Sequence, residues 1–323
     1  MEAKMMRRSG GGCKPLVEAL SAQLVKLEES NEGLAAVAQL AGAVAAVSAR
    51  MEGRLQLLEG AAGGLLAEGI QTALAADSGC EAEEFVFKTD GKEGGEEEPS
   101  PPPCLSLSIE ALLALHALYA PSGDGVSLGG LPLSPGVAAA IVAALQPPQG
   151  SAHEASLRLA MVAASAVSAA ATLDASAQQL AALQCGQVLL QTALVRFPGS
   201  LALRKEALIG LGRLLSKGGD AVDGEMLSEL HEAGILHLAV DVLEAEGETE
   251  EVPLVSALEL VGALAGLPAA QVQCSALLPK LMQAAAACDS NVLVASASAR
   301  AMGAGAAAEW AAVEAGLESD PLY

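Results

Sequence analysis

The chain repeats one helical unit, imperfectly, about six times. A small residue, often Gly, opens a short apolar stretch such as GILHLAVDVL (234–243), a polar loop follows, and a longer Ala/Leu-rich stretch such as VPLVSALELVGALAG (252–266) closes the unit. The same order occurs at 12–48, 69–120, 136–171, 186–216, 234–266 and 276–307. Tandem units of this length stack into a solenoid, in which each repeat packs mainly on its neighbours. The repeat therefore predicts an extended array rather than one globular core.

The composition indicates that this array is built from helices with small side chains. Hydrophobic residues make up 52% of the 323-residue chain, whereas aromatic residues make up only 2%. Ala and Leu, which dominate the apolar stretches, are strong helix formers. The best strand-like run, Phe85-Val86-Phe87, is too short to found a sheet. We therefore predict an all-α fold.

One acidic segment interrupts the pattern. Residues 77–103 hold nine acidic residues, four Gly and four Pro, a composition that buries too little apolar surface to become ordered. We predict that 77–103 is a disordered insertion within a repeat array that extends over 12–320, and that 1–11 form a flexible N-terminus. The insertion is either tolerated without a role or an acidic docking or regulatory segment.

The formal net charge of −22 argues against nucleic-acid and anionic membrane partners, because both reward a basic surface. The acidic side chains either solvate the loops and outer helix faces or steer a basic partner by long-range attraction. The apolar stretches 33–49, 175–195 and 260–279 are short, rich in Gln or broken by Pro, so we expect no membrane span.

The six cysteines are scattered along the chain, and none forms a CxxC pair. The first residues are basic but are not followed by the apolar segment of a secretory signal. We therefore expect reduced thiols and an intracellular protein, located in the cytoplasm with the nucleus as the alternative.

The order of a short first helix, a second that begins near a Gly and a long third one resembles the armadillo repeat, with the best match at 233–266. Ala residues at the same position of successive third helices are spaced by 44, 52, 50 and 38 residues; they are Ala111, Ala155, Ala207, Ala257 and Ala295. The resemblance implies a right-handed α-solenoid of about six three-helix repeats. HEAT repeats, another α-solenoid and a non-repeat helical bundle are the alternatives.

The resemblance also implies a partner-binding groove along the third helices. In the nuclear-import branch of the family, a Trp and an Asn one turn later bind an extended peptide there. The pairs at those positions are Leu113/Ala117, Leu157/Met161, Ile209/Arg213, Glu259/Ala263 and Ala297/Ala301. None is a Trp–Asn pair, so we do not expect an import adaptor. The mostly small and apolar pairs favour an amphipathic helix or apolar peptide as the partner.

The sequence holds no recognisable catalytic pattern. The four histidines lack metal-ligand spacing, and phosphate-loop, GxGxxG and GxSxG motifs are missing. We therefore predict no enzyme, no cofactor and no metal. The leading hypothesis is a non-catalytic scaffold, adaptor or structural subunit of a larger assembly that binds a protein or peptide. The alternatives are an armadillo-like nucleotide-exchange factor for a heat-shock chaperone and an enzyme with an unrecognised site.

Overall fold

The computed structural model describes residues 13–29, 33–49, 51–59, 61–79, 102–120, 132–146, 153–246, 251–287, 294 and 296–304. These residues form helices and the turns between them, and none of them lies in a strand. The all-α prediction is therefore confirmed for the described part of the chain. The chain divides into two compact units, Met1–Ala166 and Val167–Tyr323, and the division falls inside one helix.

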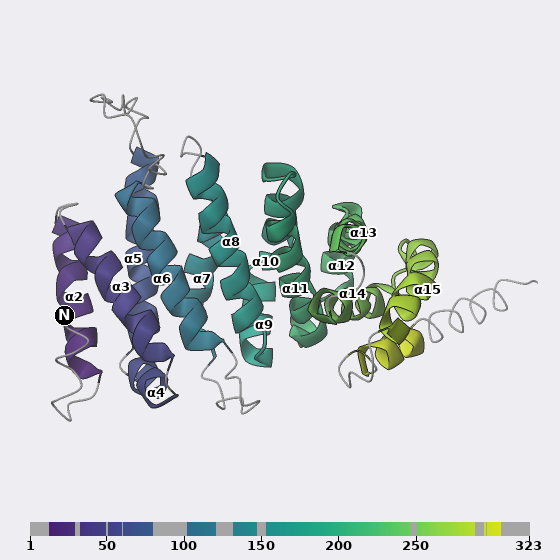
Figure 1. Ribbon diagram of the computed structural model, residues 1–323, viewed down its shortest axis with the longest axis horizontal. Helices are drawn as coiled ribbons and strands as arrows, with labels where there is room; N and C mark the ends of the chain where they lie inside the picture. The colour runs from purple at the N-terminus through teal and green to yellow at the C-terminus, as the bar shows by residue number, and fades with distance from the viewer. Residues whose placement is uncertain are drawn as a thin grey trace, which may run out of the picture. The chain divides into compact units, whose positions relative to one another are not determined.

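Unit 1 packs its helices in two layers (Figure 1). The helices are α2 (Lys14–Glu29), α3 (Leu34–Ser48), α4 (Met51–Glu59), α5 (Ala62–Gly79), α6 (Pro103–Tyr119), α7 (Pro135–Ala144) and the first part of α8 (His153–Ala170). α3 lies alongside α6 in one layer, and α5 contacts both α2 and α7 in the other. The core between the layers is aliphatic, with Leu20, Ile70, Leu105 and Leu112 almost fully buried.

Unit 2 repeats this type of packing. Its helices are the rest of α8, α9 (Asp174–Ala182), α10 (Cys185–Gln191) with a π-helical turn (Thr192–Arg196), α11 (Leu201–Lys217), α12 (Gly224–Glu232), α13 (Ile235–Glu246), α14 (Glu251–Leu264), α15 (Gln271–Ala287) and a last helical segment that includes 296–304. α11 lies alongside α14, both contact α13, and α14 also contacts α15. α11 begins where the Ser200 hydroxyl accepts a hydrogen bond from the Leu203 N–H, a typical N-cap.

A left-handed residue separates a short helix from the next helix at three places. Ala61 (φ 59°) follows α4, Gln184 (φ 55°) follows α9, and Gly234 (φ 93°) follows α12. This conformation ends a helix and turns the chain back, and it favours Gly over other residues. The same junction of short helix, left-handed residue and second helix therefore recurs in both units.

Side-chain hydrogen bonds between distant parts of unit 2 recur at a nearly constant sequence separation of 37 to 45 residues. The pairs are Arg204–Asp241 (37), Ser168–Glu206 (38), Arg300–Glu259 (41), Gln187–Glu229 and His231–Gln273 (42), and Arg213–Ser168 and Lys217–Thr172 (45). These bonds join α8 to α11, α10 to α12, α11 to α13, α12 to α15 and α14 to the last segment.

Unit 1 follows the same interval once the acidic segment is taken into account. The Cys13 N–H donates to Gln56 Oε1 across 43 residues, whereas Arg54 Nη1 donates to the Ala120 carbonyl across 66. Removing the 27 residues of 77–103 from the second interval leaves 39, which lies within the range found in unit 2. The lateral contacts are thus consistent with an insertion within one period.

The segment 77–103, which we predicted to be disordered throughout, begins and ends in helix. α5 continues to Gly79, and α6 begins at Pro103. Its interior, 80–101, lies outside the described residues, as do the predicted flexible N-terminus 1–11 and the part of the predicted array beyond residue 304.

Candidate functional site

The third helix of each predicted repeat carries a row of side chains at helical spacing, most of them exposed or half-buried. We call these rows the third-helix stripes. In unit 1 they consist of Gln39, Ala43 and Ala46 on α3, Glu110, Leu113 and Ala117 on α6, and Leu157, Arg158, Met161 and Ser165 on α8. In unit 2 they consist of Lys205, Glu206, Ile209, Arg213 and Lys217 on α11, Val252, Val255, Glu259 and Ala263 on α14, and Ser296, Ala299, Arg300 and Gly303 on the last segment.

Four of the five predicted groove pairs lie on these stripes, with differing accessibility. Leu113, Ala117, Leu157 and Met161 in unit 1 are half-buried. Arg213, Glu259 and Ala263 in unit 2 are half-buried as well, whereas Ile209 is only 8% exposed.

The fifth predicted pair points into the core. Ala297 and Ala301 are fully buried, and Ala301 packs against Gly262 of α14. A partner cannot contact either side chain directly in this fold. The exposed face of the same segment carries Arg300 instead, so the spacing between Ala257 and Ala295 selected the inner face of the last helix.

Glu259 is the centre of a charged cluster in unit 2. We call this group the Glu259 cluster; it comprises Arg213, Ser216 and Lys217 of α11, Glu259 of α14 and Arg300 of the last segment. Arg300 Nη2 lies 3.2 Å from Glu259 Oε1, and Arg300 Nη1 donates to Ser296 Oγ at 2.7 Å. The Glu259 side chain is 16% exposed, whereas that of Arg300 is 58% exposed.

Burial controls the ionisation of this cluster. Burial raises the pKa of the Glu259 carboxyl, and Arg300, a hydrogen bond from Ser216, Arg213 and Lys217 offset part of that rise. Burial likewise raises the pKa of Glu206, against the attraction of Arg213 and Lys205. In the folded chain, burial therefore disfavours the ionised form of both carboxyl groups, and the cationic neighbours only partly compensate for the lost hydration.

Two cationic side chains of α11, Arg213 and Lys217, also donate hydrogen bonds to carbonyls at the C-terminal end of α8. Arg213 Nη1 donates to the Ser168 carbonyl at 2.6 Å, and the Lys217 ammonium donates to the Thr172 carbonyl. Carbonyls in the last turn of a helix have no partner within the helix, and positive charge there is favourable. The Lys217 ammonium also lies 3.8 Å from the Asp174 carboxylate, which is 77% exposed. Arg213 and Lys217 thus hold the C-terminal end of α8 against α11.

The third-helix stripes of unit 1 are less charged. Glu110 and Arg158 are their charged members, and they lie on different helices. The other members are Gln, Ser, Ala, Leu and Met, so these rows offer shallow, mostly apolar surface. The third-helix stripes of unit 1 are therefore mostly uncharged, whereas those of unit 2 carry charged side chains that interact with one another.

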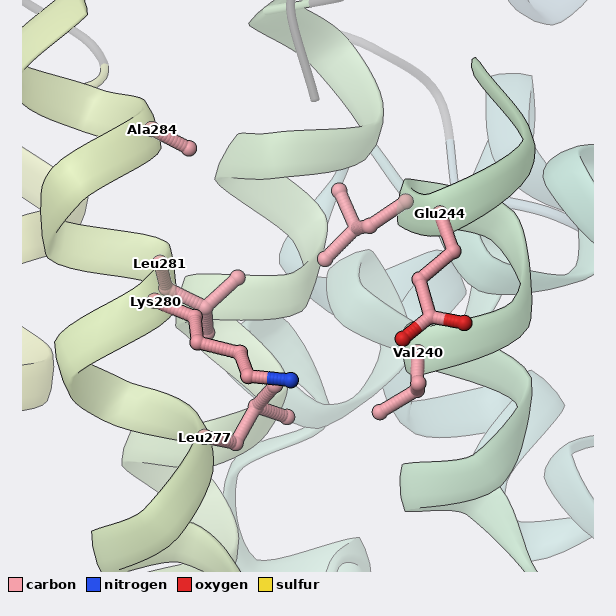
Figure 2. A pocket seen from close by; sticks show the side chains of 7 residues that line it. Val240, Glu244, Leu277, Lys280, Leu281 and Ala284 are labelled. Atoms are coloured by element: carbon pink, nitrogen blue, oxygen red, sulfur yellow. The ribbon is translucent and has the colours of Figure 1, made fainter. Parts of the chain in front are cut away.

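A small pocket lies between α13 and α15 in unit 2 (Figure 2). Its walls are aliphatic, and the polar ends of Glu244 and Lys280 point toward one another across it. The pocket holds about 20 Å³ of space for the centres of water molecules, which is room for little more than one water. It does not have the size of a substrate pocket.

Reactive groups are scarce in the part of the chain that the structure describes. Cys13, Cys185 and Cys274 are free thiols, and burial raises the pKa of Cys185 to about 12 and that of Cys274 to about 11. Neither of these two thiols forms an appreciable amount of nucleophilic thiolate near neutral pH. Among the described residues, no group of three His, Cys, Asp or Glu side chains is placed to hold a metal ion. None of the described helices is long and apolar enough to cross a bilayer.

Comparisons of the chain with protein-family models, curated proteins and solved structures give no match. The armadillo resemblance therefore rests on the sequence pattern alone.

Sequence reasoning located Arg213 and Glu259 but missed Lys217, Ser216 and Arg300. One signal could have found them. The chain has only 17 Lys and Arg residues against 39 Asp and Glu, so cations inside Ala/Leu-rich helices are unusual and merit placement on the helical wheel.

Proposed function

We propose that this chain is a non-catalytic interaction scaffold, built as an armadillo-like α-solenoid, that binds a segment of a protein partner along the third-helix stripes. The recurrence of lateral hydrogen bonds at 37 to 45 residues carries this proposal. Stacked repeats of this period would place rows of equivalent side chains along the third helices. Such rows suit an extended or helical segment better than a compact small molecule.

The character of the stripes supports binding by surface contact. They combine half-buried Leu, Met, Val and Ala side chains with a few fixed charges. When a partner covers apolar side chains that are partly exposed, the free energy of binding becomes more favourable by about 25 cal/mol per Å² of apolar surface. Fixed charges add discrimination among partners rather than large affinity.

Affinity purification of the full chain with stripe variants tests the proposal. Leu113→Glu and Leu157→Glu each place a charge on a third-helix stripe of unit 1. Val25→Glu is the matched control, because Val25 is 56% exposed on α2, which lies in the layer opposite the third helices α3 and α6. We expect the stripe variants to lose at least about 90% of the partner recovered with wild type, and Val25→Glu to retain it.

The fold of each variant is checked by far-UV circular dichroism and a thermal melt. Full partner recovery by folded Leu113→Glu and Leu157→Glu would remove the stripes as the binding surface. A heat-shock chaperone as the dominant partner would favour the exchange-factor alternative instead.

A further inference from the structure

The exposed charge of the Glu259 cluster is positive, in a chain that is strongly acidic overall. Arg300 forms an ion pair with the Glu259 carboxylate, and Arg213 and Lys217 also act on this carboxylate electrostatically. The side chains of Arg300 and Lys217 are 58% and 40% exposed, whereas that of Glu259 is 16% exposed. A partner approaching Arg300 therefore meets its guanidinium before it meets the Glu259 carboxylate, whereas the Lys217 ammonium lies beside the exposed Asp174 carboxylate.

The exposed cations keep hydrogen-bonding capacity for a ligand. Arg300 carries five N–H donors, and its described bonds go to Ser296 Oγ and Glu259 Oε1. Lys217 has three donors and reaches the Thr172 carbonyl and the exposed Asp174 carboxylate. Both cations can thus donate a hydrogen bond to an additional carboxylate without losing the contacts that hold the helices together.

Apolar surface lies next to the cluster on the same helix. Val252 is 49% exposed and Val255 is half-buried, one to two turns before Glu259 on the α14 stripe. Residues at this spacing share one helix face. The surface therefore combines an apolar patch with a positive end.

We infer that the Glu259 cluster and the α14 valines form a docking surface for an amphipathic peptide segment whose apolar side chains cover Val252 and Val255 and whose carboxylate pairs with Arg300 and Lys217. This inference rests on the proposed function and names the partner's chemistry. Charge complementarity favours this type of partner segment. The chain's net charge of −22 repels acidic segments generally, so such a segment finds attraction only where cations gather.

Selection from a phage-displayed library of random peptides, each about 12 residues long, tests the inference and does not require the natural partner. The full-length wild-type chain is the bait, and the double variant Lys217→Gln/Arg300→Gln is used for counter-selection. Lys14→Gln/Lys26→Gln is the matched control, because it removes the same two positive charges from exposed positions on α2. Val255→Glu tests the apolar part of the surface.

We expect clones specific for wild type to be enriched in Asp or Glu next to Leu, Ile or Val. A synthetic peptide from the leading clone should bind the Lys217→Gln/Arg300→Gln chain at least about tenfold more weakly, and the control chain within about twofold. Enrichment of Lys or Arg, equal loss with the control chain, or failure to obtain a wild-type-specific clone would overturn the inference.

The outcome separates this inference from the proposed function. Peptides that lose binding on Val255→Glu but bind the charge variant normally would refute the carboxylate pairing and leave a binding face on the third helices. Failure of the proposed function would appear in the Leu113→Glu and Leu157→Glu experiment, in which neither Lys217 nor Arg300 is changed.

Discussion

The two units use glycine at the contact between neighbouring third helices, but they pack there at different distances. A Cβ added to Gly42 of α3 would lie 3.6 Å from Glu110 Oε2 of α6, an ordinary contact with the end of a side chain. A Cβ added to Gly212 of α11 would lie 2.8 Å from the Ser256 backbone of α14, closer than real atoms approach. α11 and α14 are therefore in backbone contact at this point, whereas α3 and α6 leave room for a side chain.

This difference accompanies the difference in charge. Where α11 and α14 approach most closely, the cations of α11 can reach Glu259 and the end of α8. Unit 1 has a looser crossing and a neutral stripe. We interpret unit 2 as the more tightly specified surface and unit 1 as a more adaptable apolar one.

The largest expected effect separates the two glycines. Gly212→Ala should destabilise the chain by about 2–3 kcal/mol, because the methyl group has no flexible neighbour to displace. Gly42→Ala should be neutral or stabilise by up to about 1 kcal/mol, since Ala favours the helix. Urea unfolding followed by circular dichroism measures both changes. Equal effects of the two substitutions would contradict the difference in packing.

The next comparison concerns the carboxylates. Glu259→Gln should be neutral or slightly stabilising near pH 7, because burial raises the pKa of the Glu259 carboxyl more than Arg300, Arg213 and Lys217 lower it, and a neutral amide avoids that desolvation cost. Glu110→Gln on α6 should change stability by less than about 0.5 kcal/mol, as is usual for a surface substitution. Both are measured by urea unfolding at low and high salt. A loss of more than about 0.5 kcal/mol with Glu259→Gln would show that the cationic neighbours outweigh the cost of burying the carboxylate.

The left-handed junctions should respond alike in both units. Ala61→Gly and Gln184→Gly should each stabilise the chain by about 0.5–1 kcal/mol, because Gly adopts a positive φ without the steric penalty of a Cβ. Gly234→Ala should destabilise it by a similar amount. Thermal unfolding midpoints report these changes. A loss of stability in either Gly variant would argue against the shared backbone geometry.

The smallest expected effect is a pH dependence that arises from Glu206 in unit 2. Burial raises the folded-state pKa of Glu206 above its usual value of 4.5, so ionisation disfavours the folded state. The stabilising effect of the protonated carboxyl is fully present below the unfolded pKa and is lost as pH rises through the folded pKa. Glu206→Gln should therefore match wild type near pH 4 and become the more stable chain as pH rises toward 7. A constant difference across this range would contradict the burial effect.

The sequence predicted the all-α class and the order of the helices. Alignment of the third helices on the armadillo pattern placed four of the five groove pairs on the stripes of α6, α8, α11 and α14. The helix ends were less predictable. Gly63 and Gly64 disfavour a helix, yet α5 begins at Ala62 and the turn is made by Ala61 in a left-handed conformation.

The Glu259 cluster could not be derived from the sequence, because it depends on the register between neighbouring helices. Ala spacings of 52 and 50 placed successive third helices several residues away from the 37–45 interval of the observed lateral bonds. Ala is abundant on every face of these helices and therefore fixes neither face nor register. The burial of Ala297 and Ala301 has the same origin.

Hydroxyl-radical footprinting of the full chain, with and without its purified partner, tests most directly whether the third helices form the binding face. We expect protection of Leu113, Leu157, Met161 and Val255, with no change at the exposed Val25 of α2 and Val272 of α15. Protection of Val25 and Val272 without protection of the third-helix residues would contradict the proposed binding face.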